Sequence, residues 1–229
     1  MTALAGIRDR VEQLLLDTAN AIFTTGVIDE GIRQALDEYN FVNPLKLETS
    51  ITLAAAGREI SLSTLTNLLR VEEVWWPWVS TVETWPPNRV RGFRVYWDDG
   101  VPYLFLDIEE GDQPQSGEKV RVWYTARHSI QDLDSAAATT LPLEHESRIV
   151  IGAAGHAAMS RALDLVEIAG TDLYQVGLLG SWGVRKLKEY TNWLKDLQRS
   201  QARSGPAWGK GWALDKWDEG RGLPKSTYG

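Results

Sequence analysis

The sequence contains no cysteine among its 229 residues. This absence excludes disulfides, thiolate metal sites, cysteine nucleophiles and cysteine-ligated iron–sulfur clusters. The sequence also lacks a run of consecutive apolar residues near the ~20 that a membrane span needs. Charges interrupt the N-terminal stretch MTALAGIRDRVEQLLL, where a signal peptide has its apolar region. We therefore expect a protein that is neither exported nor inserted in a membrane. Packing or assembly, and not disulfides, is expected to hold it together.

Histidine is scarce as well, with three residues in the chain, and none stands in a metal-binding pattern. His145 begins the segment HES, but Ile149 occupies the position where a zinc-protease helix has its second histidine. His156 lies too far along the chain for the adjacent-turn geometry of a chelating pair. The segment GPAWGKG near the C-terminus lacks the spacing and the Ser or Thr of a phosphate-binding loop. We predict no catalytic residue, no metal ion and no cofactor.

Apolar residues repeat every three or four positions near the N-terminus, which predicts two helices. The first covers residues 3–21. The second begins with Asp29 as its N-cap and ends at Asn43-Pro44. The N-terminal segment is therefore expected to form a helical hairpin.

Two longer helices are predicted after residue 130; the first contains a run of small residues, and the second contains glycines. One is capped by Thr140 and stopped by Gly170, and the other covers residues 172–203. Small side chains let another backbone approach closely. We predict that four glycines form helix contacts between subunits: Gly152, Gly155, Gly180 and Gly183.

Residues 49–130 have a different pattern, in which polar and apolar residues alternate as in strands. The segment FRVYWDDGVPYLFLDI predicts a hairpin with its turn at residues 98–100. The segment EKVRVWYTARH predicts a strand with two different faces. Val120, Val122 and Tyr124 lie on one face, and Arg121 and Trp123 on the other.

The predicted fold class is α+β, a mostly helical bundle with an inserted small antiparallel β-sheet domain and an extended C-terminal arm. Four units make up this organisation. They are an N-terminal helical hairpin (1–48), the β domain (49–130), the C-terminal helices (131–203) and the arm (204–229).

Charge is unevenly distributed over this organisation. The net charge is -7, but ten Lys or Arg and five Asp or Glu follow from Val184 onward, so that part carries +5 and the rest -12. A basic C-terminal part on an acidic body indicates contact with an acidic surface. The same basic residues would also form the solvated face of a helix, and the sequence leaves both interpretations open.

Tryptophan is abundant, with eleven residues in the chain. The segment VWWPWVSTVETWPP contains four of them: Trp75, Trp76, Trp78 and Trp85. Some of these rings are expected to fill the core of the sheet. If the segment is a strand, however, adjacent Trp75 and Trp76 point to opposite faces, so one of them remains for a partner. We predict an interface of the β domain here.

Three segments occur in a fixed order: the helix DEGIRQALDEYN, the tryptophan-rich insert with VYWDDGVPYLFLDI and VRVWYTARHSI, and the helix TTLPLEHESRIVIGAAGHAAMSRAL. This order resembles the head-to-tail connector, or adaptor, proteins of tailed bacteriophages over most of the chain. In that family a Leu-Pro pair and a glutamate-rich start of a small-residue helix commonly follow a strand that contains tyrosine. The matching residues here are Tyr124, Leu141, Pro142, Glu144 and Glu146.

The resemblance implies a structural virion protein and not an enzyme. Such proteins form a ring, usually a dodecamer, that docks under the portal protein, extends the DNA channel and provides the tail attachment surface. The expected location is the neck between capsid and tail, after assembly in the host cytoplasm. The expected partners are the portal protein, copies of the same chain, tail or neck proteins, and channel DNA in non-specific contact; no membrane is involved.

In the family the C-terminal segment reaches out of the subunit and docks on the portal. That role would explain why a glycine-rich arm carries three tryptophans. The expected portal-binding residues are Trp208, Lys210, Trp212, Lys216, Trp217, Arg221 and Tyr228. The alternative function is a carbohydrate- or peptide-binding module that uses the tryptophans of the β domain and stays monomeric.

Overall fold

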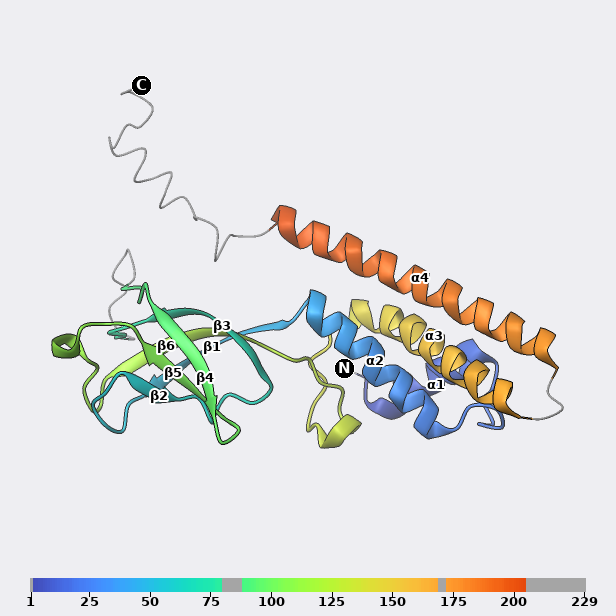
Figure 1. The fold of residues 1–229 in the computed structure, drawn as a ribbon, viewed down its shortest axis with the longest axis horizontal. Helices are drawn as coiled ribbons and strands as arrows, with labels where there is room; N and C mark the ends of the chain where they lie inside the picture. The colour runs from blue at the N-terminus through green and yellow to red at the C-terminus, as the bar shows by residue number, and fades with distance from the viewer. Residues whose placement is uncertain (1, 80–87, 169–171, 205–229) are drawn as a thin grey trace, which may run out of the picture.

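The computed structural model describes residues 2–79, 88–168 and 172–204. A helical bundle and a β domain follow each other along the longest axis, and the β domain is inserted between the second and third helices (Figure 1). This architecture confirms the predicted α+β class. The predicted C-terminal arm lies outside the described residues.

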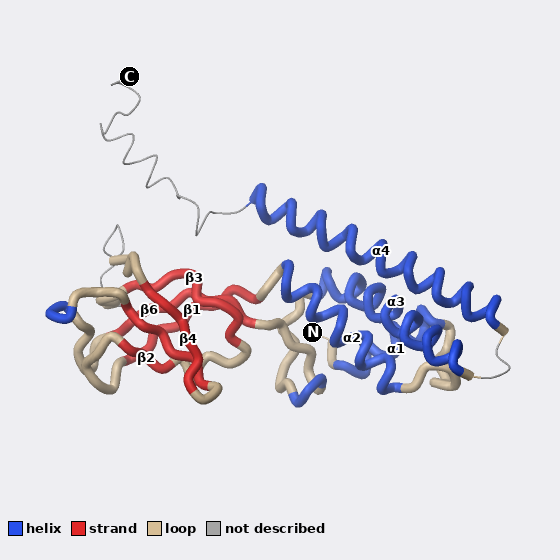
Figure 2. Tube along the Cα trace, viewed as in Figure 1, coloured by secondary structure: helices blue, strands red, loops and turns tan. Residues whose placement is uncertain are grey.

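The described part of the chain forms the bundle from four α-helices. They are α1 (Leu4–Leu15), α2 (Thr25–Val42), α3 (Leu143–Glu167) and α4 (Leu173–Ser204). Helix α3 lies between α2 and α4, and α1 also packs on α3 (Figure 2). The apolar faces of all four helices meet in one core, in which the fully buried side chains include Ile7, Ile32, Ile149 and Tyr190.

The first helix is shorter than the predicted 3–21. Leu16 adopts a left-handed conformation with φ of 56°, which ends α1. Asp17 then accepts hydrogen bonds from the backbone N–H groups of residues 21–23. A side chain that satisfies three backbone donors stabilises a tight connection there instead of a further helical turn.

The second helix begins earlier than predicted. Thr24 is its N-cap, and the Thr24 side chain accepts a hydrogen bond from the backbone N–H of Val27. Asp29 is therefore not the cap. Its carboxylate instead accepts two hydrogen bonds from the guanidinium of Arg8, both at 2.6 Å, which ties α2 to α1.

The predicted cap of the third helix is also wrong. The hydroxyl of Thr140 accepts a hydrogen bond from the backbone N–H of Ser129 at 2.8 Å and does not cap α3. In the first turn of α3, Glu146 is fully buried. Its carboxylate accepts hydrogen bonds from the backbone N–H and hydroxyl of Thr2, at 3.2 and 2.7 Å, and from Arg10 at 3.1 Å. This buried carboxylate therefore holds the N-terminal segment against α3.

The described residues of the β domain form two three-stranded antiparallel sheets, where one sheet was predicted, and the first strand begins at Leu45 and not at residue 49. The strands are β1 (Leu45–Thr52), β2 (Glu59–Ser61), β3 (Leu68–Trp75), β4 (Phe93–Asp98), β5 (Val101–Leu106) and β6 (Lys119–Ala126). Their orders are β1-β6-β3 and β2-β5-β4. Two short 3₁₀ turns cover Glu110–Asp112 and Leu133–Ser135.

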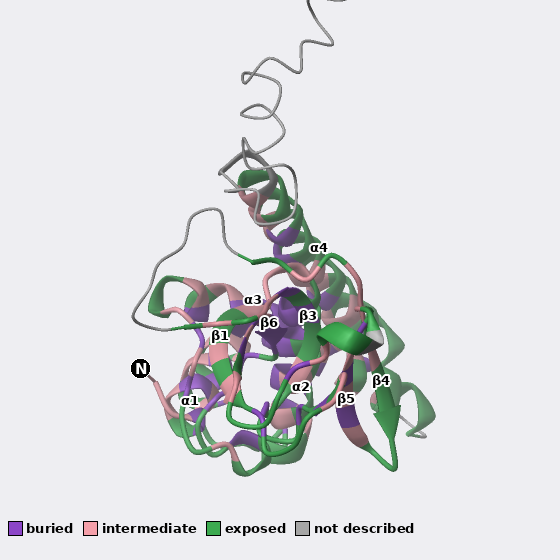
Figure 3. Cartoon of the chain, turned by 90° about the vertical axis from the view of Figure 1, so that its left-hand side faces the viewer, coloured by how far each residue is buried: buried purple, intermediate pink, exposed green. Residues whose placement is uncertain are grey.

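The predicted hairpin joins β4 to β5. Both residues of its turn, Asp99 and Gly100, have positive φ, of 46° and 77°, as the favoured two-residue hairpin turn requires. The predicted faces of β6 are also confirmed: Val120, Val122 and Tyr124 point into the core, and the opposite residues are only partly buried. Figure 3 views the molecule from the β-domain end, and the buried residues, in purple, lie mainly in its interior.

The two parts meet at a neck, where the chain enters and leaves the β domain. Leu45 of β1 pairs with Ala126 of β6, so the two crossings lie side by side. The backbone N–H of His128 donates to the side chain of Asn40 at 2.7 Å. The β domain is thus an insertion whose two ends are adjacent.

Among the described residues, α3 is the one helix with the length and apolar composition of a membrane span. Half of that stretch is buried inside the protein. A count of consecutive apolar residues missed it because charged residues such as Arg148 and Arg161 interrupt the helix. Its packing between α2 and α4 accounts for its composition, as in the core helix of a globular bundle.

Candidate functional site

Three tryptophans and an arginine gather on the face of the β1-β6-β3 sheet that points away from the β-domain core. We call Trp75, Trp78, Trp123 and Arg121 the outer cluster. The ring centroids of Trp75 and Trp123 are 4.1 Å apart, and those of Trp75 and Trp78 are 5.8 Å apart. Strand pairing brings them together, because Trp75 of β3 is directly opposite Arg121 of β6.

Arg121 organises this cluster electrostatically. Its guanidinium carbon lies 4.3 Å from the ring centroid of Trp78 and 4.9 Å from that of Trp123. It also forms an ion pair with Glu48 of β1. Since the cation covers one face of each of these two rings, the cluster is less suited to stacking on a sugar than to contact with a protein, where Trp and Arg are enriched.

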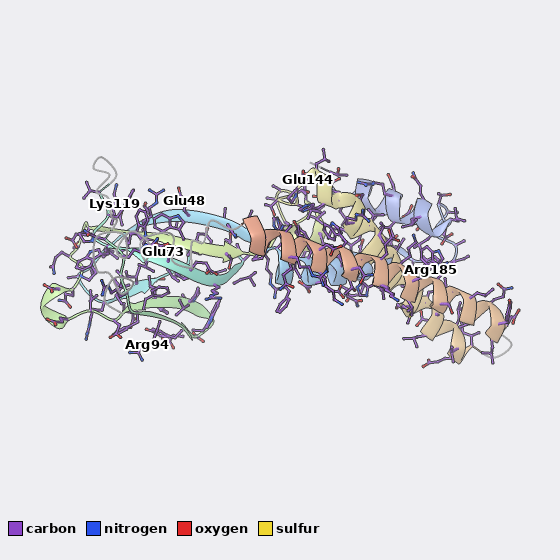
Figure 4. All side chains as sticks on the ribbon, turned by 90° about the horizontal axis from the view of Figure 1, so that it is seen from above. Glu48, Glu73, Arg94, Lys119, Glu144 and Arg185 are labelled. Carbon is purple, nitrogen blue, oxygen red and sulfur yellow. The ribbon has the colours of Figure 1, made fainter. Side chains whose placement is uncertain are left out.

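A buried carboxylate lies beside the outer cluster. Glu73 accepts a hydrogen bond from the indole N–H of Trp75 and forms an ion pair with Arg89 at 2.5 Å. Figure 4 labels Glu48 and Glu73 within the β domain. These contacts fix the orientation of Trp75, so the cluster is held rigidly.

Trp76 points the other way, as predicted. It packs on the β-domain core, and its indole N–H donates to Glu118 at 2.9 Å. The cluster of four predicted tryptophans is therefore divided between core and surface. Trp85 lies outside the described residues, as do the predicted arm residues Trp208, Lys210, Trp212, Lys216, Trp217, Arg221 and Tyr228.

The close approach predicted at the glycines is found inside the chain, between α3 and α4. A side chain at Gly152 would lie 2.8 Å from the ring of Tyr190, and one at Gly155 would lie 2.9 Å from Leu187. A side chain at Gly183 would lie 3.1 Å from the backbone oxygen of Gly155. These three glycines are explained without a second subunit. Gly180 has more space, with Ala162 at 3.7 Å, and its contact with another subunit stays a prediction.

The neck contains a buried group of aromatic and polar side chains. The hydroxyl of Tyr39 lies 2.6 Å from Nδ1 of His145, and the ring of Tyr39 stacks on Trp193 with centroids 6.0 Å apart. Burial raises the pKa of the Tyr39 hydroxyl and lowers the pKa of His128, whose ring lies 5.2 Å from that of Tyr39. The arrangement fastens α2, α3 and α4 together at the neck.

Helix α4 presents a long outward face that the rest of the described chain does not cover. In its first half, Leu178 and Val184 are about half exposed. From Arg185 onward the exposed residues include four basic ones, Arg185, Lys188, Lys195 and Arg199, and two acidic ones, Glu189 and Asp196 (Figure 4 labels Arg185). The sequence predicted the basic residues on this helix. It did not reveal that Leu178 and Val184 are exposed, because apolar residues at these positions do not interrupt a helical pattern.

Known proteins do not identify the chain: no protein-family model matches it, and no curated protein has a significantly similar sequence. In the part of the chain that the structure describes, no group of three or more His, Asp or Glu side chains is placed to hold a metal ion. The outer cluster and the outward face of α4 are two candidate binding surfaces of the described residues.

Proposed function

We propose that this protein is a head-to-tail adaptor of a tailed bacteriophage, a structural subunit of a ring that docks under the portal, extends the DNA channel and provides the tail attachment surface. The observation that carries the proposal is the uncovered outward face of α4, with exposed Leu178 and Val184 followed by basic residues. The order of segments along the chain, which resembles that family, supports it independently.

The charge on α4 favours a ring over a two-fold dimer. Five basic and two acidic residues lie between Arg185 and Arg199, a net +3. Two such faces repel each other, which disfavours the symmetric contact of a dimer. The chain before Val184 carries -12, so α4 of one copy fits an acidic surface on the body of the next. A contact between two different surfaces closes into a ring when the rotation between copies allows it.

The arm supplies the proposed contact with the portal. It follows Ser204 at the C-terminal end of α4, and its 25 residues extend up to roughly 80 Å at about 3.3 Å per residue. Ordering such a segment costs on the order of 1 kcal/mol per residue, and burial of Trp208, Trp212 and Trp217 would offset part of that cost. Repetition around a ring multiplies a modest contact made by each copy.

The test is negative-stain electron microscopy of the protein mixed with the portal protein from the same genome. We expect ring density on the portal with the full chain, and none with a chain that ends at Ser204. Replacing Trp208, Trp212 and Trp217 by alanine should also abolish docking. The matched control is Trp97→Ala, at an exposed tryptophan of β4, which should dock as the wild type does.

Two results would contradict the proposal. Docking that persists without the arm would exclude the arm as the portal contact. A protein that stays monomeric and adds no density to portals, including portals in DNA-filled heads, would exclude the adaptor role as a whole.

A further inference from the structure

The end of the bundle farthest from the β domain carries a concentration of exposed apolar side chains. We call this the hairpin tip, which consists of the last turns of α3 and the first turn of α4. Each of its large apolar side chains is between 52% and 70% exposed. They are Leu163, Val166, Ile168, Leu173 and Tyr174.

The exposure arises because α3 and α4 extend beyond the other two helices. Gly31 of α2 lies against the backbone of Ala153 and Ala157, and α2 begins only six residues earlier, at Thr25, so the last residues of α3 extend beyond α2. Figure 1 shows the α3–α4 end projecting past α1 and α2. Leu16, in the connection between α1 and α2, is 91% exposed at the same end of the bundle.

The exposed apolar surface of the hairpin tip is comparable to the largest apolar patch on a typical monomer. Burying one such side chain is worth about 1.5–3 kcal/mol at ~25 cal/mol per Å², which corresponds to on the order of 100 Å² each. Since each is between 52% and 70% exposed, the five side chains together present on the order of 300 Å². Patches of roughly 300–600 Å² are the largest on typical monomers and are often functional. A partner that covers the tip would therefore gain substantial binding energy.

The charges around the hairpin tip identify the chemistry of that partner. Asp164, Glu167 and Asp172 lie in or beside it, and Arg161, which pairs with Asp164 at 3.7 Å, is the one basic residue of this segment. The net charge is therefore -2. Two tips of this charge repel each other, and an anionic lipid surface is repelled as well. A protein with basic residues around an apolar centre is attracted.

The first tryptophans of the chain's own arm do not reach this surface. Helix α4 has 32 residues and is therefore about 48 Å long at ~1.5 Å per residue, and the arm starts at its other end. Trp208 lies four residues after Ser204 and reaches only about 13 Å from it at ~3.3 Å per residue. Neither a subunit's own arm nor that of a parallel neighbour brings its first tryptophans to the tip.

We infer that the hairpin tip is a docking site for a second protein, which contributes an amphipathic helix whose apolar stripe is bordered by lysines or arginines. The apolar centre supplies the affinity, and the acidic border selects the sign of the partner's charge. The inference does not depend on ring formation or on the portal, because the tip is formed within one copy.

The test measures binding of two fluorescent 18-residue helical peptides to the full chain by anisotropy. Both peptides carry the same leucine stripe, which one borders with lysines and the other with glutamates. We expect saturable binding of the Leu/Lys peptide and at least tenfold weaker binding of the Leu/Glu peptide. Replacing Leu163 and Leu173 by serine should weaken binding of the Leu/Lys peptide about tenfold or more. The variant should still fold, since both side chains are exposed.

Matched variants separate the tip from general attraction to an acidic protein. Phe41→Ser, at an exposed apolar residue of α2, should leave affinity within about twofold of the wild type. Glu167→Lys should weaken binding of the Leu/Lys peptide about threefold to tenfold. Glu109→Lys makes an equal change of charge on the β domain and should leave this affinity unchanged.

Four results would overturn the inference. Two of them concern the peptides: equal binding of both peptides, and Leu/Lys binding that survives the replacement of Leu163 and Leu173 by serine. The other two would show that the tip has a different occupant. A dimer in sedimentation that the serine variant dissolves would assign the tip to a second copy. Flotation with phosphatidylcholine vesicles that the same variant abolishes would assign it to a membrane.

Discussion

A single aromatic ring determines how closely α3 and α4 approach each other. Tyr190 is fully buried, and its hydroxyl donates to the backbone oxygen of Ala35 on α2 at 2.6 Å. Its ring lies over Gly152, where a methyl group has no room. Because the hydroxyl is anchored on one side and α3 lies on the other, the ring cannot move away from an added side chain.

Gly152→Ala is therefore expected to destabilise the protein. The added methyl group would lie 2.8–2.9 Å from the Tyr190 ring, and overpacking of this kind costs about 1–3 kcal/mol. Gly180→Ala is the matched control, because its methyl group would meet Ala162 at an ordinary 3.7 Å, and alanine favours a helix by up to ~1 kcal/mol. Urea denaturation measures both variants. Equal midpoints for Gly152→Ala and the wild type would show that the ring can relax.

Between elements, the neck depends on a buried histidine that follows β6. His128 is buried, and its Nδ1 lies 3.0 Å from the backbone oxygen of Thr140. Around it lie the ring of Tyr39 and the side chain of Asn40 from α2, and His145 from α3, whose charge would further disfavour protonation. Burial is the main cause of its lowered pKa.

This environment makes the folded state sensitive to acid. Because the pKa of His128 is lowered in the folded state, the unfolded chain binds the proton more readily below about pH 6.5. The contribution of neutral His128 to the free energy of unfolding is therefore fully present above that pH, and it decreases as the pH falls through the folded-state pKa. Between pH 7 and pH 5 we expect the unfolding free energy of the wild type to fall more steeply than that of the His128→Gln variant. The difference in slope corresponds to up to about one additional proton taken up on unfolding. Denaturant melts at several pH values measure both slopes, and identical slopes would contradict the assignment.

Local sequence patterns predicted the elements well but not their partners. The four helices, the β4–β5 turn and the two faces of β6 follow from periodicity and turn residues that lie close together in the sequence. The outer cluster did not follow, because it needs the pairing of β3 with β6, two strands separated by β4 and β5. The cap at Asp29 was predicted wrongly since Arg8, far away in sequence, binds that carboxylate in the fold.

At the scale of the whole molecule, the two parts have separate cores. The residues of the bundle core come from the chain before Pro44 and after Ser129, and the residues of the β-domain core come from between them. The paired residues Leu45 and Ala126 at the neck have Cα atoms about 4.5–5.5 Å apart, as opposite residues of antiparallel strands do. The bundle therefore needs only a short connection in place of the β domain.

We expect the bundle to fold without the β domain. A chain that joins Pro44 to Arg127 through four Gly and Ser residues keeps every residue of the bundle core, the hydrogen bond from His128 to Asn40, and the pair between Arg127 and Asp37. It should show helical circular dichroism, one cooperative unfolding transition, and the same Leu/Lys peptide affinity at the hairpin tip. Adding Tyr190→Ala to this chain should remove the cooperative transition, because a large buried ring lost from a small core costs about 3–5 kcal/mol. A shortened chain that is helical but melts without cooperativity would mean that the neck transmits stability from the β domain, and that the two cores act as one unit.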